Sequence, residues 1–239
     1  MGFPKWYYDE FTQAGVDYQN VQVAQKYNAR HGNFRDFSAE AARIRERTGL
    51  KPTDRLIDLG CGTGRLTMEQ APFCEKIDAV DVSEPMLAEF SALLNERQTN
   101  NITLHHAGFL TYCHEGEPAD AVFSSIALHH LSDFWKVCAL KNIHSMLKPG
   151  GIFYLYDVVF HFPLDDIDSG VEQVLAAMSQ AAGGEAFTHI KNEFSTFDWL
   201  LEAMFEKTGF AIEQTWDDLP FLRGYLLRHQ SGPIAPENH

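Results

Sequence analysis

The residues with the clearest chemical potential form a glycine-rich loop directly after a predicted strand. Residues 57–65 read Ile-Asp-Leu-Gly-Cys-Gly-Thr-Gly-Arg, with Gly60, Gly62 and Gly64 where the strand ends and a helix begins. Glycines there allow the backbone to turn sharply and to approach a ligand closely. The dinucleotide fingerprint G-x-G-x-x-G would need a sixth-position glycine, but that position is Arg65. The loop therefore indicates a ligand other than NAD or FAD.

A second signal is Asp81, which ends the next predicted strand 21 residues after Gly60. A carboxylate in this place can accept two hydrogen bonds from the vicinal hydroxyls of a ribose. The alternative is an ordinary carboxylate at a strand end. No P-loop lysine follows the glycines, so the sequence offers no group to hold a triphosphate. We therefore expect a ligand that contains a ribose.

Two histidine pairs, at positions 105–106 and 129–130, are the remaining candidates for chemistry. His129 and His130 follow the fourth predicted strand, where the carboxyl ends of a parallel sheet open toward ligands. Either could take a proton from an acceptor near neutral pH, and we favour His130; the alternative is that they only order the loop or line the pocket. Adjacent residues of a strand point to opposite faces, so neither pair can chelate as a unit, and we expect no metal.

These residues and three further motifs resemble class I S-adenosylmethionine-dependent methyltransferases over about residues 55–158. The further motifs are Val82-Ser83-x-x-Met86-Leu87 after Asp81, Asp120-Ala121-Val122 leading to Ala127-Leu128-His129-His130-Leu131, and Leu147-Lys148-Pro149-Gly150-Gly151. The resemblance implies a methyltransferase with S-adenosylmethionine as its cofactor.

The resemblance also assigns roles to single residues. Gly60 and Gly62 would pass the methionine part of the cofactor, Asp58 would lie near its amino group, and Asp81 would hold the ribose. Met86 would flank the adenine, although it could instead be a core residue. The other cofactor-binding residues that we expect are Cys61, Val82, Gly108, Phe109, Ser124, Tyr27 and Arg35.

Two of these positions carry open questions. In the family an aspartate commonly follows the third strand and binds the adenine amino group, whereas this chain has Gly108 there. Adenine recognition would then rest on backbone groups around Phe109 and on stacking. Tyr27 and Arg35 resemble residues of helices that precede the methyltransferase domain. Arg35 would close over the methionine carboxylate, or else be a surface arginine.

The predicted elements form an α/β fold. Short β-rich runs at residues 55–60, 76–81, 102–107, 119–126 and 151–159 alternate with helical stretches. This alternation indicates a Rossmann-like, doubly wound, mostly parallel sheet, which we expect to have seven strands with an antiparallel last strand. Two late strands at 210–216 and 221–228 flank a loop at 217–220, and a helix is expected from Ser195 to Thr208.

We expect residues 1–50 to form a helical lid, residues 51–229 the methyltransferase domain with a helical insertion at 160–195, and residues 230–239 a disordered tail. Nine of the first 40 residues are aromatic, and so short a segment cannot bury them alone. They should therefore pack on the main domain and cap the active site.

Composition restricts the partners. The formal net charge is −14, and residues 151–200 carry one lysine against eight acidic residues, which disfavours nucleic acid as a substrate. The four cysteines form no C-x-x-C pair, and no signal peptide or apolar span is evident, so we expect a cytoplasmic protein without membrane contact.

We expect transfer to a small or medium organic acceptor. A tRNA or other macromolecular methyltransferase, for which the basic stretch at 43–51 speaks, and a non-catalytic cofactor-binding protein are the alternatives.

Overall fold

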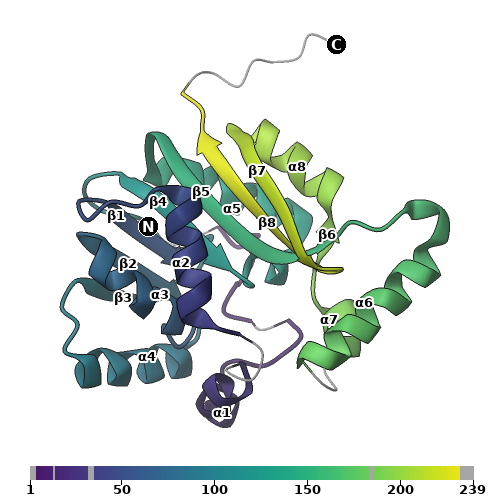
Figure 1. Cartoon of the computed structure of the whole chain (residues 1–239), viewed down its shortest axis with the longest axis horizontal. Helices are drawn as coiled ribbons and strands as arrows, with labels where there is room; N and C mark the ends of the chain where they lie inside the picture. Colours follow the sequence, from purple (N-terminus) through teal and green to yellow (C-terminus); the bar gives the residue numbers. More distant parts are fainter. Residues whose placement is uncertain (1–3, 13, 32–34, 183–185, 232–239) are drawn as a thin grey trace.

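The computed structural model describes residues 4–12, 14–31, 35–182 and 186–231. The predicted disordered tail thus lies largely outside the described residues. Within them, one twisted sheet is covered by helices on both faces (Figure 1). None of the described helices is both long and apolar enough to cross a membrane.

The sheet has its strands in the order β3-β2-β1-β4-β5-β8-β7, and a short β6 pairs with β5. β8 runs antiparallel to both of its neighbours, while β1 to β5 are parallel, which confirms the expected fold class. The strands are β1 Arg55–Leu59, β2 Lys76–Asp81, β3 Ile102–His106, β4 Ala119–Ser125, β5 Leu147–Phe160, β6 Thr196–Phe197, β7 Phe210–Leu219 and β8 Leu222–His229.

Helices cover both sheet faces, and the inner strands β1, β2 and β4 are accordingly buried along almost their whole length. One core cluster joins strand residues such as Ile57 and Val122 to α5 and α8, and a second joins Leu56 and Ile77 to α2 and α4. The α-helices are α1 Val21–His31, α2 Phe37–Thr48, α3 Arg65–Gln70, α4 Glu84–Arg97, α5 Asp133–Met146, α6 Ile167–Ala182, α7 Ala186–Asn192 and α8 Asp198–Lys207.

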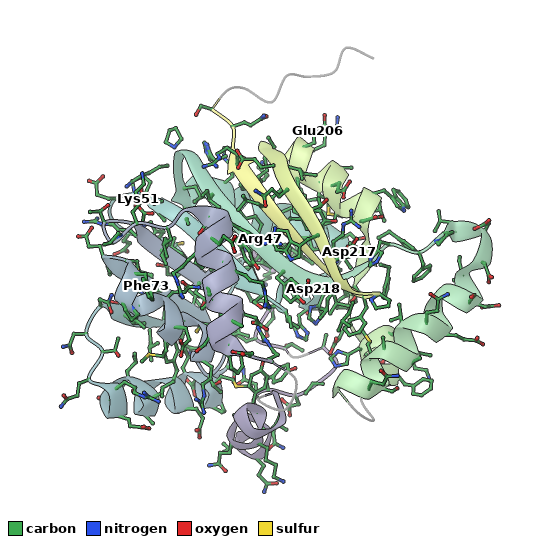
Figure 2. The ribbon with its side chains drawn as sticks, in the orientation of Figure 1. Arg47, Lys51, Phe73, Glu206, Asp217 and Asp218 are labelled. Atoms are coloured by element: carbon green, nitrogen blue, oxygen red, sulfur yellow. The ribbon has the colours of Figure 1, made fainter. Side chains whose placement is uncertain are left out.

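Helix α2 belongs to the main body rather than to a separate lid. Its Ala41 and Ile44 are buried, Ile44 within the second core cluster. Arg47 at its carboxyl end lies over the Trp216 ring of β7 at 3.9 Å (Figure 2). The structure therefore leaves only the part of the chain before α2 to act as a lid.

Three predicted boundaries differ from the structure. The last helix begins at Asp198 rather than Ser195, because Thr196 and Phe197 pair with β5 as β6. Strand β7 continues to Leu219, since its pairing with β8 carries on past a register shift between Asp217 and Leu219. Strand β5 begins directly after α5, at Leu147.

Candidate active site

A cavity of about 480 Å³ lies at the carboxyl ends of the central strands, where the strand order reverses between β1 and β4. Ligands of open α/β sheets bind at such a switch point. Its walls come from the glycine loop, the segments after β2, β3 and β4, and the N-terminal part of the chain. The predicted site residues that line it are Asp58, Gly60, Cys61, Gly62, Asp81, Val82, Met86, Gly108, Phe109, His129, His130, Tyr27 and Arg35.

Ser124 is the predicted cofactor residue that the structure does not bring to this cavity. Its hydroxyl is fully buried without a hydrogen-bond partner, and it borders a small hollow beside Ile44 and Thr67. Ser125 lines the large cavity instead. The reason is strand alternation, because neighbouring side chains of β4 point to opposite faces of the sheet.

The three loop glycines all have the left-handed backbone conformation that favours glycine, with φ of 79°, 55° and 75°. A Cβ on Gly60 would lie 2.3 Å from the Ala127 side chain, and one on Gly64 would lie 2.1 Å from the Phe90 ring. A Cβ on Gly62 would meet no atom within 4 Å, so this glycine presents its open side to the cavity that it lines.

Gly62→Val should weaken the binding of S-adenosylhomocysteine by tenfold or more, because the added side chain would stand where the ligand passes the loop. Gly49→Val is a matched control: Gly49 has a φ of 63° and also has free space at Cβ, but it caps α2 and lies outside the cavity wall. Both variants carry the same backbone strain. Calorimetric titration of the two folded variants should show lost affinity for the first and retained affinity for the second; equal affinities would contradict the placement.

Two backbone amides hold Asp81 in place at the carboxyl end of β2. Its Oδ2 accepts a hydrogen bond from the Gly62 amide and its Oδ1 one from the Ser83 amide, each at 2.8 Å. Burial raises the pKa of this carboxyl, and the two amides oppose that rise. Each oxygen keeps a further lone pair on a group that lines the cavity, which suits a pair of vicinal hydroxyls.

Asp58 lies at the floor of the cavity with only 8% of its surface exposed. Thr67 donates a hydrogen bond to its Oδ2 at 2.5 Å. Burial, followed by repulsion from Asp81 and opposed by the Thr67 hydroxyl, raises the pKa of Asp58 to about 6. An ammonium group beside this carboxylate would offset both effects, which fits the amino group of a methionine moiety.

Arg35 is buried rather than a surface arginine. Its Nε and Nη2 form a bidentate pair with Glu40 at 3.0 and 2.6 Å, and Nη2 also donates to Ser125 at 3.0 Å. This pairing fixes the guanidinium at the cavity wall. Its contact with a cofactor carboxylate remains a prediction.

The sequence interpretation missed Glu10, whose carboxylate lies against Gly108. Its Oε1 accepts hydrogen bonds from the amide and the hydroxyl of Thr111, at 2.7 and 2.6 Å, and both oxygens accept from the Leu110 amide. Burial raises the pKa of Glu10 and these donors oppose the rise. Glu10 lines the cavity and is only 7% exposed. The only sequence feature that pointed to a carboxylate from elsewhere in the chain was the missing side chain at Gly108.

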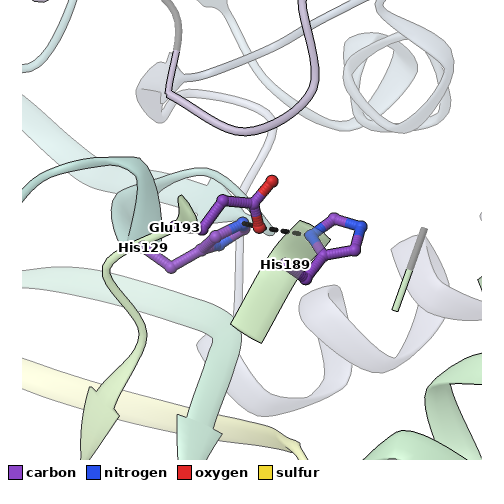
Figure 3. A group of neighbouring side chains, drawn as sticks. All are labelled: His129, His189 and Glu193. Atoms are coloured by element: carbon purple, nitrogen blue, oxygen red, sulfur yellow. Dashed lines mark hydrogen bonds and ion pairs between the residues drawn. The ribbon is translucent and has the colours of Figure 1, made fainter. Parts of the chain in front are cut away.

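His129 belongs to a buried ionic network with Glu193 and His189 (Figure 3). The His129 ring Nδ1 bonds Asp157 at 2.5 Å, and its Nε2 lies 3.3 Å from Glu193, which also pairs with His189. Burial alone would lower the pKa of His129, but the two carboxylates raise it to about 9. We therefore expect His129 to be cationic near pH 7, which favours His130 over His129 as the proton acceptor.

His130 has the opposite electrostatic character. Burial, assisted by the charge of His129, lowers its pKa to about 4. Its Nδ1 lies 3.3 Å from the Ala14 carbonyl, which can only accept, so Nδ1 carries the proton of the neutral ring. The lone pair of that ring is then on Nε2, and His130 lines the cavity.

The ligand atoms of His129, His189 and Glu193 lie within 4.8 Å of one another, a grouping that could hold a metal ion. The sequence interpretation considered only adjacent histidines and did not foresee that a histidine and a glutamate four residues apart would meet His129. In the structure these same atoms pair with one another as an ionic network. That the protein needs no metal stays a prediction, which metal analysis of the purified protein would check.

The His129 network should make stability depend on pH. Because the folded pKa of His129 lies above its unfolded value of 6.5, its contribution is fully present below pH 6.5 and is lost as the pH rises to about 9. Urea denaturation should show a free energy of unfolding lower by on the order of 2 kcal/mol at pH 9 than at pH 6.5. His129→Gln should flatten this slope and His130→Asn should keep it; a flat wild-type profile would contradict the network.

Comparison with known proteins agrees with this fold. Residues 56–151 match the family described as methyltransferase domain. An uncharacterized methyltransferase from Geobacillus kaustophilus is 26% identical over 178 residues, which are 74% of this chain and 79% of that protein. One from Bacillus cytotoxicus is 24% identical over 216 residues, 89% of this chain and 90% of that protein.

Solved structures share the fold at lower identity. An S-adenosylmethionine-dependent methyltransferase from Clostridium acetobutylicum has a TM-score of 0.66 at 14% identity, covering 88% of this chain and 98% of that one. The complex of DhpI with S-adenosylhomocysteine has a TM-score of 0.63 at 19% identity, with 89% and 93% covered. The [4+2]-cyclase SpnF has a TM-score of 0.68 at 17% identity, with 89% and 94% covered.

The fold is that of class I S-adenosylmethionine-dependent methyltransferases. The protein is a methyltransferase, and S-adenosylmethionine is its cofactor.

Proposed function

We propose that this methyltransferase acts on a small or medium organic acceptor that binds between the cofactor and His130. The observation that carries the proposal is the enclosure of this part of the cavity by the chain before α2. Ala14 contacts His130 through its carbonyl, and the Tyr18 ring lies edge-on to the His130 ring with centroids 5.8 Å apart. A cavity of about 480 Å³ with these walls has the size of a small-molecule site.

The part of the cavity near His130, the acceptor half, combines apolar walls with one neutral base, His130. The apolar residues that line it from β5, α6 and the start of β8 with its preceding turn are Val158, Met178, Phe221 and Leu222. They exclude water and orient an organic acceptor, and positioning of this kind supplies several kcal/mol.

When bound, the cofactor supplies a methyl group that is already electrophilic. The acceptor would gain this methyl group as S-adenosylhomocysteine leaves, and a hydroxyl acceptor would become strongly acidic in that transfer. His130 Nε2 then takes the proton. A histidine of low pKa is sufficient for this step, and the cationic His129 beside it favours subsequent release of the proton.

The macromolecular alternative receives less support from the basic stretch at 43–51. Arg45 donates to the Glu69 carbonyl and to Gln70, while Arg47 packs on Trp216 and donates to Gln214. These arginines therefore serve contacts within the chain. They also lie outside the cavity wall, so an RNA phosphate bound to them would not reach the site directly.

The acceptor class is testable with methyl-labelled S-adenosylmethionine. The protein would be incubated in parallel with a small-metabolite extract, with total tRNA and with a protein lysate cleared of small molecules. We expect label in the metabolite fraction and its loss in His130→Asn. Label in tRNA or protein would overturn the acceptor proposal, and cofactor binding without label anywhere would favour the non-catalytic alternative.

A further inference from the structure

Glu10 and Gly108 are sterically complementary. A Cβ built on Gly108 would lie 2.3 Å from Oε2 of Glu10, 2.4 Å from its Cδ and 2.6 Å from Cγ1 of Val82. The Glu10 carboxylate thus occupies the place that a short acidic side chain at 108 would fill. It also satisfies the backbone amides of Leu110 and Thr111, which such a side chain would cap.

This carboxylate lines the part of the cavity where we expect the base of the cofactor. If Asp81 holds the ribose and Asp58 the methionine amino group, the adenine would lie on the other side of Asp81. The cavity wall there is formed by the side chains of Val82, Met86 and Phe109, which offer apolar surface to a flat ring. Glu10 is a buried hydrogen-bond acceptor beside this apolar wall. The amino group of an adenine is a hydrogen-bond donor that would match it.

The two oxygens of Glu10 differ in their remaining capacity. Oε1 accepts from the Leu110 amide and from both the amide and hydroxyl of Thr111. Oε2 accepts a hydrogen bond from the Leu110 amide at 3.0 Å and lies on the side of Gly108 and Val82. The donors thus fix the carboxylate and leave Oε2 able to accept another hydrogen bond.

We propose that Glu10, which belongs to the N-terminal segment, recognises the adenine of S-adenosylmethionine. Its Oε2 would accept a hydrogen bond from the adenine amino group. Gly108 is the residue that makes room for this carboxylate.

The placement makes the N-terminal segment part of the cofactor site as well as of the acceptor site. Between Glu10 and α1, the segment is tied to the main body by the Ser83 hydroxyl, which donates to the Tyr18 carbonyl, and by Gln19, which donates to the Val82 carbonyl. The same segment supplies the Ala14 carbonyl to His130. One segment therefore borders both the proposed adenine site and the part of the cavity at His130.

Calorimetry with two ligands that differ at one position of the base provides the test. S-adenosylhomocysteine carries the amino group, whereas S-inosylhomocysteine carries an oxygen that would face the carboxylate. The full-length wild type should bind the adenosyl ligand about 10- to 100-fold more tightly. Glu10→Ala should reduce this ratio to about threefold or less. Asp9→Asn is the matched control, because Asp9 is the exposed neighbour whose bonds stay within its own turn, and it should keep the ratio.

Moving the carboxylate from position 10 to position 108 distinguishes recognition of the base by a carboxylate from a purely structural role of Glu10. Gly108→Asp alone should bind poorly, because two carboxylates would compete for one place, whereas Gly108→Asp combined with Glu10→Ala should restore the ratio. If Glu10 only ordered the segment, Glu10→Ala would weaken both ligands equally and leave the ratio unchanged, which would overturn the proposal. Tighter binding in Glu10→Ala would also overturn it, since Glu10 would then block the site. Failure of wild type to bind either ligand would instead contradict the cofactor site itself.

Discussion

Asp81→Ala should weaken the binding of S-adenosylhomocysteine by on the order of 100-fold or more. The variant loses two charge-assisted hydrogen bonds to the ribose, each worth about 1.5–3 kcal/mol. It also removes the acceptor of the Gly62 and Ser83 amides, so the glycine loop and the start of α4 lose their common anchor. Calorimetric titration measures the effect directly.

The control for this variant is Asp78→Ala, which removes a carboxylate from the same strand. Asp78 bonds His105 and Lys76 and lies outside the cavity wall. It should leave the affinity within about twofold of wild type. An unchanged dissociation constant in folded Asp81→Ala would reject the ribose assignment.

His130→Asn should lower the turnover rate by roughly 10²- to 10⁴-fold while leaving the affinity for S-adenosylhomocysteine nearly intact. His114→Asn is the control, because His114 is half-buried outside the cavity wall, where it bonds the Glu117 carbonyl and the Tyr112 hydroxyl. Comparison of kcat with cofactor affinity separates a base from a residue that only lines the pocket, since the second role would reduce affinity more than turnover.

The pH profile provides an independent check of the same residue. From the ordinary histidine pKa, the sequence predicts that the rate falls as the pH drops through about 6.5. In the structure, burial and the His129 charge lower the pKa of His130 to about 4. The rate should therefore stay level from pH 8 to pH 6 and fall only toward pH 5 and below. A rate loss under threefold in His130→Asn with a flat profile would remove His130 from the catalytic residues.

Most residues that the sequence predicts for the cofactor line the cavity, because their positions are encoded locally. The glycine loop, Asp81 and the Ser83 cap of α4 each lie within a few residues of a strand end, so spacing along the chain is enough to position them. Ser124 was assigned to the wrong face, because one residue along a strand reverses the direction of the side chain.

The position of Glu10 and the network around His129 could not be predicted in the same way, because contacts between distant segments create them. Glu10 meets Leu110 across 100 residues, and His129 meets Asp157 and Glu193 from three separate parts of the chain. No spacing rule connects these positions, and the electrostatics that separate His129 from His130 follow only from their burial. The lid is also smaller than expected, since α2 packs into the core.

The most direct test of the account is a crystal structure of the full chain with S-adenosylhomocysteine. We expect both ribose hydroxyls within hydrogen-bonding distance of Asp81, the methionine amino group at Asp58, and the sulfur facing the part of the cavity lined by His130. A nucleoside bound away from Asp81, or a sulfur turned away from His130, would contradict the account.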